Sequence, residues 1–571
     1  MKYLHWFWFG IHIVTQLLAQ SMDPIPFDWS GQNGISSDGG LLLWNRDWNS
    51  NELFFDGTFQ SYPLRFGEEI ARDATLSYTY GSHNILFPDS AEIHTSFDYR
   101  QGDYLYDQLN IHADFIQPNR IMKWNGFKRS YGGPVSQFIQ PENQSTRALT
   151  PNQQSYSLYY LSKMNNGIST LSIGRFITDS GLYNFSEQNG RHKNEITSAS
   201  FSVNSEWQQF DLRFRIAQYL ENRLWNTVFS LRPRHYLSRG LYEGILSSSV
   251  ENVDLPWQVG VSAHTQALTF PDTTISKGRS WFSIWGNLTR NRFQVNGGID
   301  AEKESVLPRF SITINRNLGS MKWINEVGIK NIPQHLVSWT DSSSFFESWI
   351  TMKSHLDWEN KKLAISGGVS AWHVNSILDY TSDNVASPRE IFSVRCGLSW
   401  ESMHGLRFSS FWRHSSKEPL LSDGIGDHIK TKLEYTRSLF SNKMLLTAGL
   451  TVEGLLNRDS SFVYYPELQR PQDSTQTTRY LINYTDETGK NQQEIWPSFL
   501  KDYFTAHLLI SAKVSSVTIS YRMQNLFNIQ EKMFSQLFPD LPDAWVSPNN
   551  NGYFKPMGRL VSFEVEWEFK D

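Results

Sequence analysis

From about residue 93 onward, the sequence alternates apolar and polar residues in segments of about ten residues. In residues 107–116, for example, Leu109, Ile111, Ala113 and Phe115 occupy every second position, and a polar residue lies between each two of them. Successive side chains of a β-strand point to opposite faces. About ten tilted strand residues are enough to cross the hydrocarbon core of a bilayer. The pattern therefore predicts membrane-spanning strands with one apolar and one polar face.

The same alternation recurs along the rest of the chain, in residues 207–218, 292–301, 363–369, 392–398, 428–435 and 561–569. A soluble β-sandwich also alternates, but its strands typically have only about five or six residues. The connections between segments are alternately short and long, as in outer-membrane barrels. The short ones are 164–167, 204–206, 317–320, 359–361 and 514–516, and the long ones include 132–152, 456–502 and 527–558. These features predict an all-β transmembrane antiparallel barrel.

The number of strands follows from a parity condition. About 23 segments between residues 93 and 571 fit the pattern, and two short turns, at 204–206 and near Asn291, should lie on the same side of the membrane. The chain between them must then form an even number of strands, whereas an odd number of segments fits. One segment in 207–290 is therefore in excess, and we place it at 234–242. The prediction is about 22 strands, with 24 as the alternative.

Composition agrees with this fold. The mean hydropathy is −0.45, and no stretch after residue 22 provides the roughly 18 consecutive apolar residues of a membrane-spanning helix. Aromatic residues nevertheless make up 14% of the chain, including 21 Trp and 24 Tyr, which suits a barrel with aromatic girdles at both membrane interfaces. A secreted soluble β-protein, such as a carbohydrate-binding protein or a β-propeller, is the alternative outside the membrane.

Charge and cysteine content exclude several classes of protein. The formal net charge is −5 and no block of Lys and Arg occurs, so no nucleic acid partner is expected. The single cysteine, Cys396, excludes an intramolecular disulfide, a zinc finger and a dithiol redox motif. It lies in register with Val394 and Leu398, so it is predicted to face lipid.

The N-terminus predicts export. Lys2 precedes a mostly apolar stretch at 4–18, and the small residues at 19–21 form a cleavage site. Residues 1–21 are therefore predicted to be a signal peptide. An uncleaved anchor is the alternative, although the stretch is short for a span. Residues 22–90 form a short N-terminal extension, placed in the lumen or at the periplasmic mouth, or a linker, and residues 91–571 form the barrel.

Motifs that carry reaction chemistry are missing from the sequence. It contains no His-Glu-x-x-His, no Gly-x-Ser-x-Gly, no Walker A motif and no EF-hand loop. We therefore expect no catalytic, cofactor-binding or metal-binding residues and predict that the protein is not an enzyme. An outer-membrane phospholipase or protease barrel is the alternative.

Charged residues on the polar faces of the strands are the candidate lumen-lining set. These are Asp211, Arg213, Arg215, Arg395, Arg407, Arg413, Lys430, Lys432 and Glu434. They either pair across neighbouring strands and solvate the wall, or line a constriction that selects solutes by charge. Arg395, Arg407 and Arg413, on adjacent predicted strands, are expected to form a cationic patch.

The two ends of the barrel carry a resemblance to a known family. The last strand is predicted to close the barrel, with alternating Val561, Phe563, Val565, Trp567 and Phe569. Together with the Asn-Leu-Phe-Asn run at 525–528 and the opening segment at 97–106, it resembles TonB-dependent-receptor-like outer-membrane barrels. The resemblance implies such a barrel over 93–571 and an outer-membrane location.

The chain departs from that family in two respects. A TonB-dependent receptor carries a full N-terminal plug domain, and residues 22–90 are too few for one. The resemblance therefore implies the porin type that lacks a full plug. In addition, Phe569 is followed by Lys570 and Asp571, whereas outer-membrane signals usually end on the aromatic residue itself.

The expected function is passage of small hydrophilic solutes across the outer membrane through a channel that is porin-like or resembles a plugless TonB-dependent receptor. Residues 22–90 and 456–502 are the expected occluding elements. Expected partners are outer-membrane lipid, the barrel assembly machinery and a small hydrophilic solute, and no cofactor is expected. The alternative is a ligand-binding barrel that works with a separate lipoprotein or plug partner.

Overall fold

The computed structural model describes most of the region after residue 86. The continuous stretches are 87–130 without 104, 152–182, 190–226, 234–248, 255–290, 292–333 without 304, 346–375, 389–416 without 403, 426–457, 502–527 and 559–570. Short strands are described at 35–38, 41–44, 52–55, 58–61, 378–379, 384–385, 462–465, 470–473, 481–485 and 491–495. The predicted signal peptide at 1–21 lies outside these residues.

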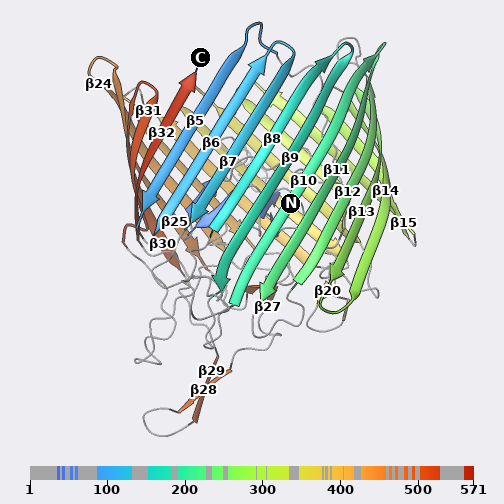
Figure 1. The fold of residues 1–571 in the computed structure, drawn as a ribbon. Coiled ribbons are helices and arrows are strands. Elements are labelled where there is room, and N and C mark those ends of the chain that lie inside the picture. Colours follow the sequence, from blue (N-terminus) through green and yellow to red (C-terminus); the bar gives the residue numbers. More distant parts are fainter. Residues whose placement is uncertain are drawn as a thin grey trace, which may run out of the picture.

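Within the described residues, 22 strands close into one antiparallel barrel (Figure 1). The strands are β5 (Glu92–Gly102), β6 (Tyr106–Gln117), β7 (Arg120–Ser130), β8 (Asn152–Met164), β9 (Gly167–Leu182), β10 (Gly190–Trp207), β11 (Phe210–Asn226), β12 (Arg234–Ser248), β13 (Trp257–Phe270), β14 (Ile275–Arg290), β15 (Phe293–Glu302), β16 (Ser305–Leu318), β17 (Met321–Pro333), β18 (Phe346–Glu359), β19 (Leu363–Asn375), β22 (Arg389–Glu401), β23 (Leu406–Ser415), β24 (Asp427–Leu439), β25 (Met444–Leu456), β30 (Tyr503–Val514), β31 (Val517–Gln524) and β32 (Leu560–Lys570). Each strand pairs with the next in the sequence, and β32 pairs with β5 to close the ring. The predicted all-β barrel of about 22 strands is confirmed.

Short two-stranded sheets accompany the barrel. They are β1 (Ile35–Asp38) with β2 (Leu41–Trp44), β3 (Glu52–Phe55) with β4 (Thr58–Ser61), β20 (Leu378–Asp379) with β21 (Asn384–Val385), β26 (Phe462–Tyr465) with β27 (Arg470–Asp473), and β28 (Leu481–Thr485) with β29 (Asn491–Ile495). The first two precede the barrel, in the predicted N-terminal extension, and the others lie in long connections between barrel strands. Among the described residues, no helix has the length and apolarity needed to cross a membrane.

The two ends of the barrel differ in the length of their connections. Short turns join β6 to β7, β8 to β9 and β30 to β31, at the end where β5 begins and β32 stops. At the opposite end, β7 and β8 are separated by residues 131–151, and β25 and β30 by residues 457–502. Figure 1 shows the short turns at the top with the C-terminus, and the β28–β29 hairpin at the bottom. Outer-membrane barrels have short periplasmic turns and long outer loops, so we call these the periplasmic end and the loop end.

Alternation along the strands separates a lipid face from a lumen face. On β11, Leu212, Phe214 and Ile216 are 41%, 50% and 38% exposed, whereas Arg213 and Arg215 are 6% and 4% exposed. Large apolar side chains are exposed in the same way along the outside of the other strands. Lipid solvates these side chains in place of a protein core, so the strands form because their apolar faces meet the bilayer and their polar faces meet the lumen.

Two predictions about individual segments were wrong. The turn expected at 204–206 is part of β10, and the chain turns at Gln208 and Gln209 instead. Asn204 and Ser205 favour turns locally, but Ser205 pairs with both Gly167 and Leu212, and this pairing on two sides extends the strand. The segment at 234–242 is not in excess, because it forms the first part of β12. The parity condition still holds, since β11 to β14 are four strands.

Candidate functional site

The inner face of the barrel is the candidate site, and the first predicted residues on it lie on β11. Arg215 and Glu243 are opposite each other in the β11–β12 register. Their side chains form an ion pair with an Nη2–Oε2 distance of 2.8 Å, and both are almost fully buried. Arg213 and Asp211 occupy the same face towards the periplasmic end. For Arg215, the geometry supports cross-strand pairing that holds the wall.

The predicted arginine patch is divided by the structure. Arg395 of β22 lies directly opposite Arg413 of β23 in the register. The Nη2 atom of Arg395 is 3.4 Å from Nδ1 of His355, and Arg413 is fully buried. Arg407 lies near the periplasmic end of β23, where it is exposed and pairs with Glu401 at 3.0 Å. The structure therefore brings two of the three arginines together. Their role in selectivity stays a prediction.

The inner face of β24 carries charges of both signs, namely Lys430, Lys432 and Glu434. The Nζ atom of Lys432 is 2.5 Å from Oε2 of Glu434. In the register, Glu434 lies opposite Arg407 and Lys430 lies opposite Glu453. Each predicted charge thus has an opposite charge beside it. This stretch of wall offers both signs of charge to the lumen.

A polar cluster that the sequence did not single out lies at the loop end of β24, β25 and β30. Nε2 of His428 is 2.7 Å from Oε1 of Glu453, and Nε2 of His507 is 3.1 Å from Oγ1 of Thr505. The backbone amide of Asn525 donates to Nδ1 of His507 at 3.1 Å. All of these side chains are buried. Their common position on the polar faces was the available signal, but the pairing across strands was not visible in the sequence.

These histidines and acids are not arranged as a metal centre. Within the part of the chain that the structure describes, no group of three or more His, Cys, Asp or Glu side chains could hold a metal ion. One of these hydrogen bonds instead joins β24 to β25, and another joins β30 to Asn525 at the end of β31. Its chemistry fits cross-strand support.

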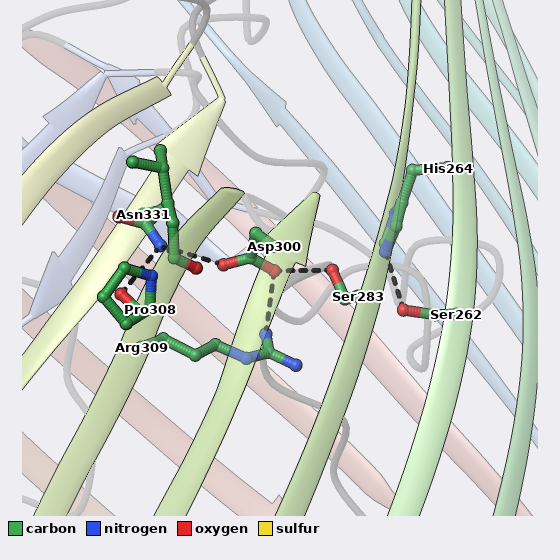
Figure 2. A network of polar contacts seen from close by, with 8 residues as sticks. Ser262, His264, Ser283, Asp300, Pro308, Arg309 and Asn331 are labelled. Carbon is green, nitrogen blue, oxygen red and sulfur yellow. Dashed lines mark hydrogen bonds and ion pairs between the residues drawn. The ribbon is translucent and has the colours of Figure 1, made fainter. Parts of the chain in front are cut away.

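A second polar network is centred on Asp300, which is fully buried (Figure 2). Oγ of Ser283 on β14 donates to Oδ1 of Asp300 at 2.6 Å, and Nη1 of Arg309 on β16 lies 3.6 Å from the same oxygen. Nδ2 of Asn331 on β17 donates to the other carboxylate oxygen at 3.1 Å. Four consecutive strands are linked through this one carboxylate.

The same amide of Asn331 also serves the backbone of β16. It donates to the carbonyl of Pro308 at 3.2 Å and lies 3.5 Å from that of Leu307. The β16–β17 ladder runs from Leu318 and Met321 to Phe310 and Ile329. No backbone pairing joins the described residues 305–309 and 330–333. The side chain of Asn331 therefore acts where the ladder has ended.

A serine and a histidine lie close together on β13, next to this network (Figure 2). Oγ of Ser262 is 2.9 Å from Nε2 of His264, a distance compatible with a nucleophile and its base. However, the His264 ring is stacked on Trp281, with centroids 4.7 Å apart and an interplanar angle of 1°, and both Ser262 and His264 are buried. The neighbouring carboxylate of Asp300 is engaged by other partners. We assign the pair a packing role.

The predicted closing strand is β32, which pairs with β31 on one side and β5 on the other. Its apolar residues alternate as expected, with Phe563, Trp567 and Phe569 exposed on the lipid face and Val561 and Val565 half-buried between neighbours. The acidic residues between them point to the lumen, where Glu564 pairs with Arg522.

Comparison with known proteins identifies the fold. No protein-family profile and no curated protein matches this sequence. Solved structures do match. The FrpB iron transporter from Neisseria meningitidis (F3-3 variant) is 11% identical with a TM-score of 0.57, over 86% of this chain and 83% of that chain. The fold is that of a TonB-dependent-receptor barrel.

Two further structures support the assignment. The siderophore receptor PirA from Acinetobacter baumannii is 10% identical with a TM-score of 0.58, over 85% of this chain and 81% of that chain. The copper transporter OprC is 10% identical with a TM-score of 0.57, over 84% and 81%. Such low identities show the fold and not the cargo. A closed 22-strand barrel with exposed apolar side chains on its outer face agrees with the predicted outer-membrane location.

Proposed function

We propose that this chain mediates the passage of small hydrophilic solutes across the outer membrane. The observation that carries the proposal is the closed barrel itself, whose 22 described strands enclose a lumen. A barrel of this size is too wide to be filled by its own inward side chains. The proteins of similar fold include transporters of iron and copper and a siderophore receptor.

The inner wall supports a charged or strongly polar cargo. Lys432 and Arg522 keep 46% and 38% of their side-chain surface exposed, while their partners Glu434 and Glu564 are largely covered. Accessible cations beside largely covered anions on the same face favour solutes that exchange hydration for polar contacts. Small ionic solutes and metal chelates are the classes that fit this wall.

Ion conductance in planar bilayers tests the proposal. The purified full chain and a variant without residues 22–90 should both insert, and the variant should pass the larger current if the predicted extension occludes the lumen. Swelling of proteoliposomes in sugars of increasing size then gives the size limit. The proposal fails if neither protein conducts although both show the heat-modifiable gel migration of a folded barrel.

A second candidate is a ligand-binding barrel with a separate lipoprotein or plug partner. The observation in its favour is that the long connections, including 457–502 and 525–559, join strands at the same end of the barrel. Purification in mild detergent should then yield a stoichiometric partner, and this partner should no longer co-purify when these loops are shortened. Conductance that is unchanged by any co-purified protein would instead favour the simple channel.

We also propose that the chain is not an enzyme. The Ser262–His264 pair has the spacing of a nucleophile and its base, but it is buried against Trp281. A fluorophosphonate probe should therefore leave Ser262 unlabelled. Labelling that is lost in Ser262→Ala would overturn this part of the proposal.

A further inference from the structure

The end of β17 leaves the barrel wall. Val327 and Ile329 are 51% and 39% exposed on the lipid face, so Asn331, two residues further along, would be expected to face lipid as well. Asn331 is instead 1% exposed, and its amide donates to the inward-facing carboxylate of Asp300. An outward position of β17 therefore contacts the inner face of β15.

The end of β18 behaves in the same way. Ile350 and Met352 are exposed on the lipid face, and Phe346 has the same parity, yet it is 2% exposed. Its ring lies edge-on to the inward-facing Trp281 of β14, with centroids 5.7 Å apart. The β17–β18 register is continuous up to the pair Pro333 and Phe346, so no bulge has reversed the faces. The loop ends of β17 and β18 lie inside the wall formed by β14 to β16.

Pro308 explains why the strands part here. The amide of Asn315 donates to the carbonyl of Arg292, so odd-numbered residues of β16 bond towards β15. In an antiparallel sheet, the N–H and C=O of one residue point towards the same neighbouring strand. Even-numbered residues of β16, including Pro308, therefore direct their backbone polar groups towards β17. Continuing the ladder would place Pro308 opposite Asn331, where proline has no N–H to donate. Such a position makes β16 an edge strand.

The unpaired part of β16 lies at the depth of the lipid. Its outward side chains are Val306, which is 63% exposed, Pro308, and Phe310, which is 45% exposed. The neighbouring β15, from Phe293 to Glu302, is just long enough to cross the hydrocarbon core. The β15–β16 hairpin therefore ends near the outer membrane surface, and the separation between residues 305–309 and 330–333 opens towards the outer leaflet. We call this separation the seam.

The lumen side of the seam is aromatic. Trp281, Phe346 and Trp349 are all at most 2% exposed and lie on the strands that overlap there. A polar latch, made of Asp300, Ser283, Arg309 and Asn331, holds the overlap closed (Figure 2). Among the described residues, the seam is thus held by side-chain contacts, whereas the rest of the β16–β17 contact is held by the backbone ladder from Phe310 to Leu318. Separating two strands joined by a backbone ladder would leave N–H and C=O groups unsatisfied in lipid. Opening this seam breaks fewer backbone hydrogen bonds.

We propose that the seam between β16 and β17 is a lateral passage between the lumen and the outer leaflet for a single-chain amphiphile. Its acyl chain would pass between the apolar outer face of β16 and the aromatic residues behind it, while its headgroup stays with the polar groups of the latch. In this structure the Asn331–Asp300 contact keeps the passage closed. The inference goes beyond the proposed passage of hydrophilic solutes and does not depend on it.

Disulfide locking tests the passage. In a Cys396→Ser background, Leu307→Cys and Asn331→Cys introduce thiols at two neighbouring residues, since the Asn331 amide lies 3.5 Å from the backbone carbonyl of Leu307. The matched control is Asn296→Cys with Ser311→Cys, a directly opposed pair in the intact β15–β16 ladder. The probe is a fluorescent lysophosphatidylcholine added to proteoliposomes that contain trapped albumin. Ion conductance is measured on the same preparations.

The background protein should transfer the probe faster than protein-free vesicles. Oxidation of the 307–331 pair should reduce transfer to the protein-free rate, and a reductant should restore it. Conductance and the control pair should be unaffected by oxidation. Transfer that is equally fast in the oxidised and reduced 307–331 pair overturns the inference, as does a background protein that transfers no faster than empty vesicles. Loss of conductance alone would count against the proposed channel and not against the seam.

A second variant avoids dependence on the disulfide. Asn331→Ala removes the contact of β17 with the latch and should increase probe transfer, whereas Asn296→Ala, which removes an amide–hydroxyl bond in the paired wall, should not. Equal transfer rates for these two variants, with both proteins folded, would contradict the proposal.

Discussion

Nε of Arg100 on the first barrel strand donates to Oγ of Ser562 on the last, over a distance of 2.8 Å. The same guanidinium donates to Gln524 of β31 at 3.1 Å and lies 4.9 Å from the ring centroid of Tyr106. Arg100 is 3% exposed. One buried side chain thus connects both ends of the barrel sequence, where the last strand pairs with the first and closes the ring.

Arg100→Ala should weaken closure of the barrel. It removes two charge-assisted hydrogen bonds from a buried site, so we expect the free energy of unfolding to fall by about 3 kcal/mol. The urea dependence of heat-modifiable gel migration measures this change. The control is Arg407→Ala, whose exposed pair with Glu401 should contribute no more than about 1 kcal/mol. Equal midpoints for the two variants would show that the Arg100 contacts do not support closure.

Most of the barrel was predictable because lipid imposes a simple rule on every strand. Phe563, Trp567 and Phe569 had to alternate with polar residues, and they do so in β32. Turn positions were less predictable, because the local preference of Asn204 and Ser205 competes with pairing to both neighbours. The turn preference of these two residues is overridden, because a strand paired on both sides satisfies all its backbone hydrogen-bonding groups in lipid.

Gly260→Ala should disturb the packing of β13 on β14. A Cβ at Gly260 would lie 2.2 Å from the ring of Trp285, which would have to move. We expect a loss of about 1–3 kcal/mol in unfolding free energy, as for other overpacked sites. Gly278→Ala, on β14, is the control, because its Cβ would meet nothing closer than 3.7 Å. Unfolding monitored by tryptophan fluorescence compares them, and similar stabilities would mean that Trp285 has room to rearrange.

The site residues were less predictable than the strands. Alternation assigned Arg395 and Arg413 to the inner face, but their direct opposition depends on the β22–β23 register, which turn length and distant closure determine. The seam left two signals in the sequence. One is Pro308 inside a strand, and the other is Asn331 at a position that alternation assigns to lipid. Each signal alone is weak evidence for a break in the ladder. Only the three-dimensional overlap shows that Asn331 turns inward where Pro308 ends the pairing.

Asp300→Ala should destabilise the barrel strongly around β14 to β17. It leaves Arg309 without its carboxylate and Ser283 and Asn331 without their acceptor. Removing one partner of a buried ion pair typically costs about 3–5 kcal/mol. Glu568→Ala is the control, because its pair with Lys513 is exposed on both sides. Urea unfolding should separate the two variants clearly, and a loss as small as that of Glu568→Ala would show that the network around Asp300 is not a major support.

Arg395→Ala should shift the ion selectivity of the channel towards cations. Arg395 is a half-buried cation on the inner wall opposite Arg413, and its guanidinium faces His355 and no acid in the contacts described, so its charge adds to the local positive potential. Arg407→Ala should cause a smaller shift, because Glu401 already offsets its charge. Reversal potentials of single channels in a potassium chloride gradient measure both. If the two variants shift the reversal potential equally, or Arg395→Ala leaves it unchanged, the opposed arginines do not set selectivity and serve only the wall.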